Sequence, residues 1–210
     1  MTDAPRKIRL LMELRREGVT DTRVLAALER VPREQFVPET FRDQAYDNTA
    51  LPIGHGQTIS QPLVVALMTQ ALEVGPRMRV LEIGTGCGYQ TAVLCGLARR
   101  VYTIEMHRAL QAEAEKRLLA LRLTNFTAMA GDGARGWPEQ APFDRIIVTA
   151  APKRLPSALI DQLADDGVMV IPLGAELDDQ WLERIAKHDG QIERKRMFPV
   201  RFVPLISAAV

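Results

Sequence analysis

Cysteine is scarce in this chain of 210 residues, which contains only Cys87 and Cys95. Two cysteines are too few for a disulfide framework, and their separation is not the spacing of metal ligands. We therefore expect no disulfide scaffold and no metal site. Because so few thiols fit a reducing compartment best, we expect the protein to be cytoplasmic.

An excess of one charge and a long apolar run are also missing. The chain has 27 lysines and arginines against 26 aspartates and glutamates, a net charge of +1. No global field therefore draws it to nucleic acid or to an anionic membrane. No window holds the roughly 20 uncharged apolar residues of a membrane span, and residues 1–17 lack the apolar segment of a secretion signal. We expect neither nucleic acid nor a membrane as a partner.

The chain does contain enough apolar material for one sizeable core. Hydrophobic residues make up 47% and charged residues 25%, which is the balance of a folded globular protein. We expect residues 1–210 to form a single domain with three parts. These are N-terminal helices with a long loop (1–62), a βα core (63–178) and C-terminal strands (179–210).

The N-terminal part combines helical spacing with an irregular stretch. Apolar residues predict two short helices between Arg6 and Val31, and Thr20-Asp21 is typical of the N-cap of the second. From Pro32 to Pro62, prolines and glycines interrupt the chain without any periodicity, which predicts an irregular loop. Loops of this length are uncommon in a compact domain and are often functional.

Beyond Pro62, short apolar runs alternate with helical patterns. This alternation predicts a parallel sheet with helices on both faces, so the expected fold class is α/β, doubly wound and Rossmann-like. Two extended runs around Asp189-Gly190 predict a C-terminal β-hairpin that completes the sheet. The expected strands are 79–83, 101–105, 125–130, 143–149 and 168–173, and the expected helices are 63–72, 89–98, 110–121 and 158–163.

A glycine-rich turn, Gly84-Thr85-Gly86-Cys87-Gly88, follows the first of these strands and opens a helix. At this place α/β sheets bind ligands that contain adenosine, and glycine lets the backbone reach positive φ and approach the ligand. A dinucleotide motif would need glycine at position 89, where Tyr89 stands. Glu82 would repel a pyrophosphate but attract the ammonium and sulfonium groups of S-adenosylmethionine. The turn therefore favours S-adenosylmethionine over NAD.

Two later strands also end in acidic residues. Glu105 closes the second strand, where a carboxylate can accept hydrogen bonds from both ribose hydroxyls, as it also does in NAD enzymes. Asp132 lies between Gly131 and Gly133 after the third strand and can accept from an adenine amino group, although an ordinary Asp-Gly turn explains it as well. Three acidic strand ends in a row favour an adenosine site.

A longer set of motifs resembles one enzyme family, in the same order from about Val24 to Leu205. Gln57-Thr58-Ile59-Ser60-Gln61-Pro62 is distinctive of the protein-L-isoaspartate (D-aspartate) O-methyltransferase family, whereas the glycine turn is shared by class I methyltransferases at large. The resemblance implies the fold of a class I S-adenosylmethionine-dependent methyltransferase. The motifs that carry it are Leu51–Pro62, Glu82–Tyr89, Gly131–Gly133, Ala141–Asp144, Ile146–Pro152 and Val200–Leu205.

The resemblance also implies an activity and a set of site residues. The activity is methyl transfer from S-adenosylmethionine to the α-carboxylate of L-isoaspartyl residues, with D-aspartyl residues as a further substrate, which begins the repair of damaged proteins through a succinimide. Damaged proteins and peptides are then the partners, and we expect a monomer. Ser60 is the implied active-site residue. The implied cofactor residues are Gln57, Thr58, Ile59, Ser60, Glu82, Gly84, Thr85, Gly86, Gly88, Glu105, Met106, Asp132 and Gly133. The implied substrate residues are Leu51, Pro52, Ile53, Gly54, Val203, Pro204 and Leu205.

This reaction needs no general base. An α-carboxyl group has a reference pKa of about 3.5, so the acceptor is already an anion at pH 7. The enzyme must hold that anion in line with the methyl group, and one hydroxyl such as that of Ser60 can orient it. Because Ser60 lies two residues before Pro62, a purely structural role as a helix N-cap is the alternative.

Three other functions are alternatives to isoaspartyl methylation. The first is a methyltransferase for another carboxylate or a small molecule, which methylation of an isoaspartyl peptide beside its aspartyl twin distinguishes. The second is an NAD-dependent oxidoreductase, which Tyr89 disfavours and which thermal shifts with each cofactor distinguish. The third is a binding module without catalysis, which turnover excludes.

Overall fold

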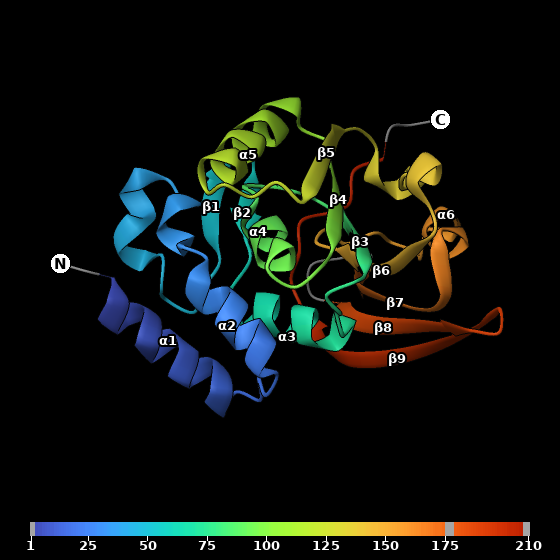
Figure 1. The fold of residues 1–210 in the computed structure, drawn as a ribbon, viewed down its shortest axis with the longest axis horizontal. Coiled ribbons are helices and arrows are strands. Elements are labelled where there is room, and N and C mark those ends of the chain that lie inside the picture. The colour runs from blue at the N-terminus through green and yellow to red at the C-terminus, as the bar shows by residue number, and fades with distance from the viewer. Residues whose placement is uncertain (1–2, 175–178, 208–210) are drawn as a thin grey trace.

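A seven-stranded sheet forms the centre of the computed structural model, which describes residues 3–174 and 179–207 (Figure 1). The strand order is β5-β4-β3-β6-β7-β8-β9. Pairing is parallel from β5 to β7 and antiparallel between β7, β8 and β9. The strands are β3 (Arg79–Ile83), β4 (Arg100–Glu105), β5 (Phe126–Ala130), β6 (Phe143–Val148), β7 (Leu163–Leu173), β8 (Gln180–His188) and β9 (Gln191–Val200). The doubly wound α/β prediction is confirmed.

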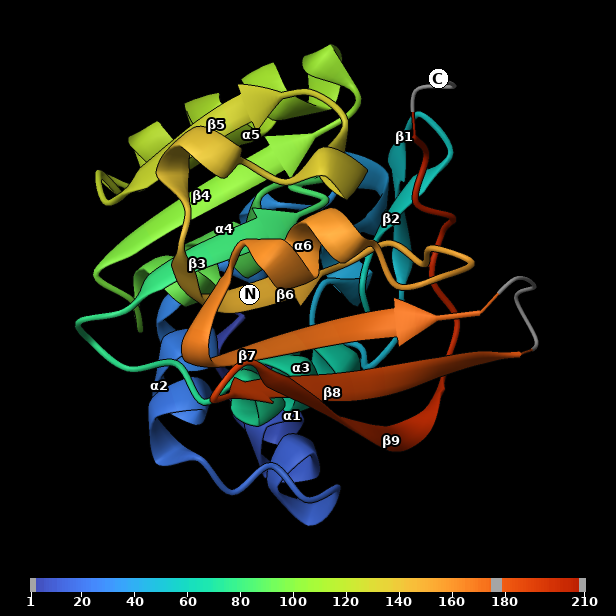
Figure 2. The same cartoon turned by 90° about the vertical axis from the view of Figure 1, so that its right-hand side faces the viewer.

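Helices cover both faces of this sheet, because successive strand residues point to opposite sides. Along β3, Val80 faces the core that the N-terminal helices complete, whereas Leu81 and Ile83 face a second core under α6. Figure 2 shows α6 in front of the sheet and α5 behind it. The helices are α1 (Ala4–Arg16), α2 (Thr22–Arg30), α3 (Pro62–Leu72), α4 (Tyr89–Cys95), α5 (Arg108–Ala120) and α6 (Ser157–Asp161).

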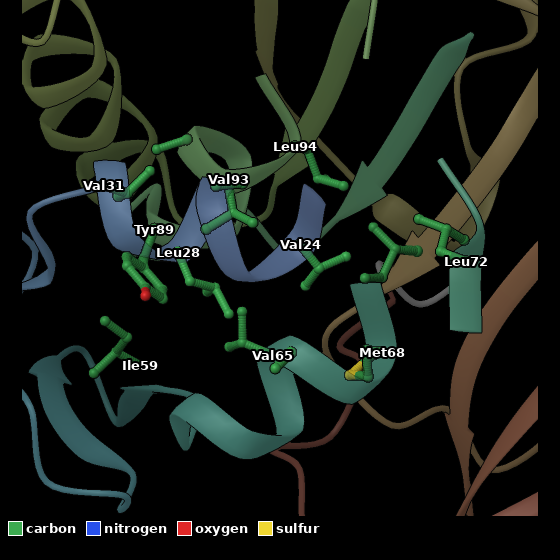
Figure 3. Packing of buried hydrophobic residues seen from close by; sticks show 14 of the residues in the cluster. Val24, Leu28, Val31, Ile59, Val65, Met68, Leu72, Tyr89, Val93 and Leu94 are labelled. Atoms are coloured by element: carbon green, nitrogen blue, oxygen red, sulfur yellow. The ribbon is translucent and has the colours of Figure 1, made fainter. Parts of the chain in front are cut away.

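The N-terminal helices belong to the larger core and are not a separate appendage. Helices α2, α3 and α4 meet through interdigitating apolar side chains (Figure 3). Burial of each such side chain contributes about 1.5–3 kcal/mol relative to leaving it in water. This contact holds the start of α3, and the residues just before it, against α4. The side chains involved include Val24, Leu28, Val65, Met68, Val93 and Leu94.

The expected irregular loop between Pro32 and Pro62 is wrong in part. This stretch contains two 3-10 helices (Arg33–Gln35 and Glu39–Gln44) and a hairpin of β1 (Leu51–Gly54) and β2 (Gln57–Ile59). Leu51 and Ile59 pair across the hairpin and are both buried, so they anchor it on the core. The sequence did not predict this hairpin because it contains Pro52. Proline is found in edge strands but is more often typical of a loop.

The remaining elements match the expected ones, with shifted ends. Helix α4 is three residues shorter than expected and ends at Cys95, and β7 begins at Leu163 instead of 168. The sequence did not predict the first residues of β7, because Asp165-Asp166-Gly167 is typical of a turn. In the structure these three residues lie within the strand, at an irregularity in the β6–β7 pairing. The C-terminal hairpin is confirmed, and Asp189 and Gly190 form its turn with φ of +48° and +72°.

Candidate functional site

The chain passes from β3 to β4 and β5 on one side of the sheet, and then crosses to β6 on the other side of β3. Open α/β sheets bind ligands at the carboxyl ends of the strands beside such a change of direction. A first cavity lies at this edge. The β1–β2 hairpin and the segment after β9 complete its wall, and both run along this edge of the sheet in Figure 2. Its lining residues are Gln57, Thr58, Ile59, Ser60, Val65, Met68, Ile83, Gly84, Thr85, Gly86, Cys87, Tyr89, Gln90, Ile104, Glu105, Met106, His107, Gly133, Thr149, Ala150, Val203, Pro204, Leu205 and Ile206.

A second cavity adjoins the first. Four residues line both, so they form the wall or passage between the two spaces. The shared residues are Thr58, Ser60, Thr149 and Val203. The second cavity is otherwise lined by Asn48, Thr49, Ala50, Gln61, Val64, Pro199, Val200, Arg201 and Phe202.

Most of the site residues expected from sequence meet at the first cavity, and some do not. The expected residues that line it are Gln57, Thr58, Ile59, Ser60, Gly84, Thr85, Gly86, Glu105, Met106, Gly133, Val203, Pro204 and Leu205. The expected residues that line neither cavity are Leu51, Pro52, Ile53, Gly54, Glu82, Gly88 and Asp132. Residues 48–50 and 199–202, which the sequence analysis did not assign to the peptide substrate, line the second cavity.

Glu82 points away from the first cavity. It lies on the face of β3 that α4 covers, is fully buried, and accepts a hydrogen bond of 2.5 Å from the Thr91 hydroxyl. Its Oε1 has no hydrogen-bond partner among the described residues. Burial raises the pKa of Glu82 to about 8, so this carboxyl is predominantly neutral at pH 7. The structure therefore does not support the expected attraction between a Glu82 charge and the cofactor.

Glu105 connects two segments at the edge of the first cavity. Its Oε2 accepts from the backbone N–H of Gly86 at 2.8 Å, and its Oε1 accepts from the N–H of His107 at 3.0 Å. The glycine turn after β3 is thereby held against the end of β4. Each carboxylate oxygen keeps a second lone pair that can accept from a ligand hydroxyl.

Asp132 and two of the glycines have structural neighbours that the sequence did not reveal. Asp132 accepts from the N–H of Ala134 at 2.9 Å and from the Ser207 hydroxyl at 2.8 Å, so it ties the C-terminal segment to the end of β5. A Cβ at Gly133 would lie 2.3 Å from the side chain of Ile83, and one at Gly88 would lie 3.2 Å from Ala114. These glycines make room for protein side chains.

Ser60 is not a helix cap. The N-cap of α3 is Gln61, and its side chain makes no capping hydrogen bond, so the structural alternative for Ser60 is wrong. The Ser60 hydroxyl has no hydrogen-bond partner among residues 3–174 and 179–207, while both cavities border it. It can therefore donate to a ligand. Thr58, in β2, lies two residues earlier and also lines both cavities.

Arg33 supports the backbone at Ser60 and was missed by the sequence analysis. This side chain is fully buried, and its Nη2 donates to the carbonyl oxygen of Ser60 at 2.8 Å while its Nε donates to that of Ala45. The guanidinium carbon lies 4.7 Å from the ring centre of Tyr89, at the start of α4. Burial lowers the pKa of Arg33. Its sequence neighbours, Val31-Pro32 and Glu34-Gln35, do not distinguish it from an exposed arginine.

The first cavity carries little charge. None of its lining residues within the described part of the chain is Lys or Arg, so no cationic side chain is present to neutralise a pyrophosphate. Burial raises the pKa of the Cys87 thiol and of the Tyr89 phenol, which keeps both neutral at pH 7. In the described ranges, no cluster of three or more His, Cys, Asp or Glu side chains could hold a metal ion.

None of the helices in the part of the chain that the structure covers has both the length and the apolar character needed to cross a membrane.

Comparison with known proteins gives one consistent result. The family model described as protein-L-isoaspartate (D-aspartate) O-methyltransferase matches residues 5–209. A protein-L-isoaspartate O-methyltransferase of Paramagnetospirillum magneticum is 66% identical over 203 residues, which are 96% of this chain and 95% of that protein. Its counterpart in Rhodospirillum centenum is 62% identical, over 98% of this chain and 94% of that protein.

Solved structures agree with these relatives. A protein-L-isoaspartate O-methyltransferase structure has a TM-score of 0.86 and 28% identity, over 94% of this chain and 65% of that longer chain. A second structure is that of a Plasmodium falciparum protein assigned as a protein-L-isoaspartate O-methyltransferase, in complex with S-adenosyl-L-homocysteine. It has a TM-score of 0.81 and 28% identity, and the match covers 94% of this chain and 97% of that chain. The resemblance found in the sequence motifs is confirmed: this chain belongs to the protein-L-isoaspartate (D-aspartate) O-methyltransferase family.

Proposed function

We propose that the two cavities carry out methyl transfer from S-adenosylmethionine to the α-carboxylate of an L-isoaspartyl residue, with Ser60 as the residue that orients the carboxylate. The observation that carries this proposal is the place of Ser60, whose uncommitted hydroxyl borders both cavities. A transfer enzyme needs such a meeting point, because donor and acceptor must come within about 3–3.5 Å of each other. The first cavity then takes the cofactor and the second takes the peptide.

The residues of the first cavity fit S-adenosylmethionine. Glu105 offers lone pairs for ribose hydroxyls, and Gly86, with φ of +54°, gives the turn a backbone conformation that other residues rarely adopt. A lining without Lys or Arg suits a ligand that has no pyrophosphate. When bound, this cofactor supplies a methyl group on a positively charged sulfur. We propose Gln57–Ser60, Gly84–Gly86, Glu105, Met106 and Gly133 as the residues that hold it.

The protein's own part in the reaction is to position and to exclude water. The substrate carboxylate needs no deprotonation at pH 7, and no base is required beside Ser60. The Ser60 hydroxyl donates a hydrogen bond to one carboxylate oxygen, which orients the other oxygen toward the first cavity. Arg33 keeps this hydroxyl in place by holding the Ser60 carbonyl oxygen. The C-terminal residues Val203–Leu205 close the cavity from the other side.

We further propose that the enzyme acts as a single-domain monomer in the cytoplasm, on damaged proteins and without nucleic acid or membrane partners. Two buried free thiols support a reducing compartment. Damaged D-aspartyl residues are proposed as a further substrate. Gel filtration with light scattering tests the monomer, and a D-aspartyl peptide tests the further substrate.

The decisive experiment compares two peptides that differ only in the linkage at one aspartyl residue. The enzyme is incubated with methyl-labelled S-adenosylmethionine and either the L-isoaspartyl peptide or its normal L-aspartyl twin. We expect base-labile methyl ester on the isoaspartyl peptide only. Equal labelling of the two peptides, or labelling of neither, removes the proposed substrate.

A further inference from the structure

Thr149 lines both cavities, yet no feature of the sequence assigned it a role. It follows β6 directly, and its backbone N–H donates to the carbonyl oxygen of Ile83 at 2.9 Å, which extends the pairing of β3 and β6. Its hydroxyl oxygen lies 2.7 Å from the carbonyl oxygen of Gly84 and 3.0 Å from that of Ile83. A hydroxyl has only one proton to donate, and the shorter contact assigns it to Gly84.

The two residues fit each other in shape as well. Gly84 has φ of +94°, and a Cβ there would lie 2.4 Å from the Thr149 hydroxyl oxygen. The hydroxyl therefore occupies the space that a side chain at position 84 would take. Glycine is therefore required at position 84 for this contact as well as for the turn. The hydrogen bond fixes the direction in which the Gly84 carbonyl group points.

The hydroxyls of Thr149 and Ser60 lie at the same wall but differ in whether they can donate a hydrogen bond to a ligand. The Ser60 hydroxyl has no partner in the described ranges and can donate to a substrate, whereas the Thr149 proton is committed to the glycine turn. Thr149 therefore cannot replace Ser60 as the donor to a carboxylate. What it can do is hold the backbone that the cofactor contacts.

We infer that Thr149 is a positioning residue for the cofactor: its hydrogen bond to Gly84 fixes the glycine turn against the wall between the two cavities, and so sets how the methyl-donating end of S-adenosylmethionine is held near Ser60. This inference rests on the proposed assignment of the first cavity to the cofactor. Without the hydrogen bond, the Gly84 carbonyl oxygen loses the contact that fixes it, and the Gly84–Thr85 peptide is held from its N–H side, by the 3.3 Å hydrogen bond from Thr85 to the carbonyl oxygen of Ile104. A misplacement of about 1 Å at a reacting group can cost about 100-fold in rate.

The test compares Thr149→Val, Thr149→Ala and Thr149→Ser in the full-length enzyme. Calorimetry measures the Kd of S-adenosylhomocysteine, and steady-state kinetics gives kcat and the KM of the isoaspartyl peptide. We expect the valine and alanine variants to bind S-adenosylhomocysteine about 10-fold more weakly and to lose about 10-fold in kcat, with the peptide KM within about twofold of wild type. Thr149→Ser keeps the hydroxyl and should restore both values to within about twofold.

Thr127→Val is the matched control. The Thr127 hydroxyl on β5 also takes part in a hydrogen bond, which it accepts from Arg100. Because Thr127 lines neither cavity, removal of its hydroxyl should leave the Kd unchanged. In Thr149→Val, a valine methyl group would lie against the Gly84 carbonyl oxygen. If thermal unfolding shows that Thr149→Val does not fold, the alanine and serine variants of Thr149 give the same comparison.

Wild-type affinity in both Thr149→Val and Thr149→Ala would overturn the inference, as would a serine variant that binds as weakly as the alanine variant. Failure of the proposed function has a different result. In that case the wild-type enzyme leaves the isoaspartyl peptide unmethylated, while the Kd of S-adenosylhomocysteine still changes with residue 149.

Discussion

The Glu105 carboxylate accepts the backbone N–H of Gly86 at 2.8 Å and thereby joins the end of β4 to the glycine turn after β3. The same carboxylate accepts the N–H of His107, so it is oriented from two sides before any ligand arrives. Such pre-orientation lowers the conformational entropy that the Glu105 side chain loses when a ligand binds. This relationship predicts a specific effect of Glu105 on cofactor affinity.

Glu105→Ala should weaken the binding of S-adenosylhomocysteine, because it removes acceptors for ligand hydroxyls and releases the Gly86 N–H. One hydrogen bond to a charged group is worth about 2 kcal/mol, which corresponds to about a 30-fold rise in Kd. Titration calorimetry measures it. Glu113→Gln, on the exposed side of α5, is the control and should bind normally. An unchanged Kd in Glu105→Ala would show that the cofactor does not use this carboxylate.

Ser60→Ala should lower kcat about 30-fold while leaving the Kd of S-adenosylhomocysteine within about twofold of wild type. The reason is that the hydroxyl serves the carboxylate acceptor, at about 2 kcal/mol for one charged hydrogen bond. Initial rates with a saturating isoaspartyl peptide give kcat. Ser157→Ala, at the exposed start of α6, is the control. A fully active Ser60→Ala enzyme would contradict the orienting role.

Glu82 should make the protein less stable as the pH rises. Burial raises its pKa to about 8 from an ordinary value of 4.5, so between these values the folded state holds a proton that the unfolded state has lost. The free energy of unfolding then falls with increasing pH, by at most about 1.4 kcal/mol per pH unit from this group. Glu82→Gln removes this contribution.

Urea unfolding of wild type and Glu82→Gln between pH 5 and pH 8 measures the effect. The free energy of unfolding of the glutamine variant should rise relative to that of wild type across this range. The reason is that only the wild type releases a proton from residue 82 when it unfolds. A difference that stays constant with pH would mean that Glu82 has an ordinary pKa in the folded protein.

Asp21→Ala should destabilise the protein by about 1 kcal/mol. Asp21 is the N-cap of α2, as the sequence predicts, and its carboxylate accepts from the backbone N–H groups of Arg23 and Val24. Thermal and urea unfolding give the change. The control is Asp43→Ala, which removes an exposed ion pair with Arg6 and should change stability by less than about 0.5 kcal/mol. Equal losses in both variants would contradict the capping role.

The sequence by itself determined the local features of this protein. Alternating apolar runs specified the parallel strands, because buried strands and amphipathic helices have different periods. The glycine turn and Glu105 were predictable for the same reason, since each follows a strand directly and parallel strands end at one edge of the sheet. The motif around Ser60 indicated the family without any knowledge of the fold.

Only the tertiary structure decided which side chains meet. Glu82 belongs to the same motif as the glycine turn, yet the alternation along β3 turns it under α4 and away from the first cavity. Thr149 and Ser60 come together because β6 and the hairpin end at the same wall, although they are distant in the chain. Arg33 reaches the Ser60 carbonyl only through packing around α4. The direction in which a side chain points and the distant residues that it contacts both depend on how the core packs, and no local sequence pattern encodes that packing.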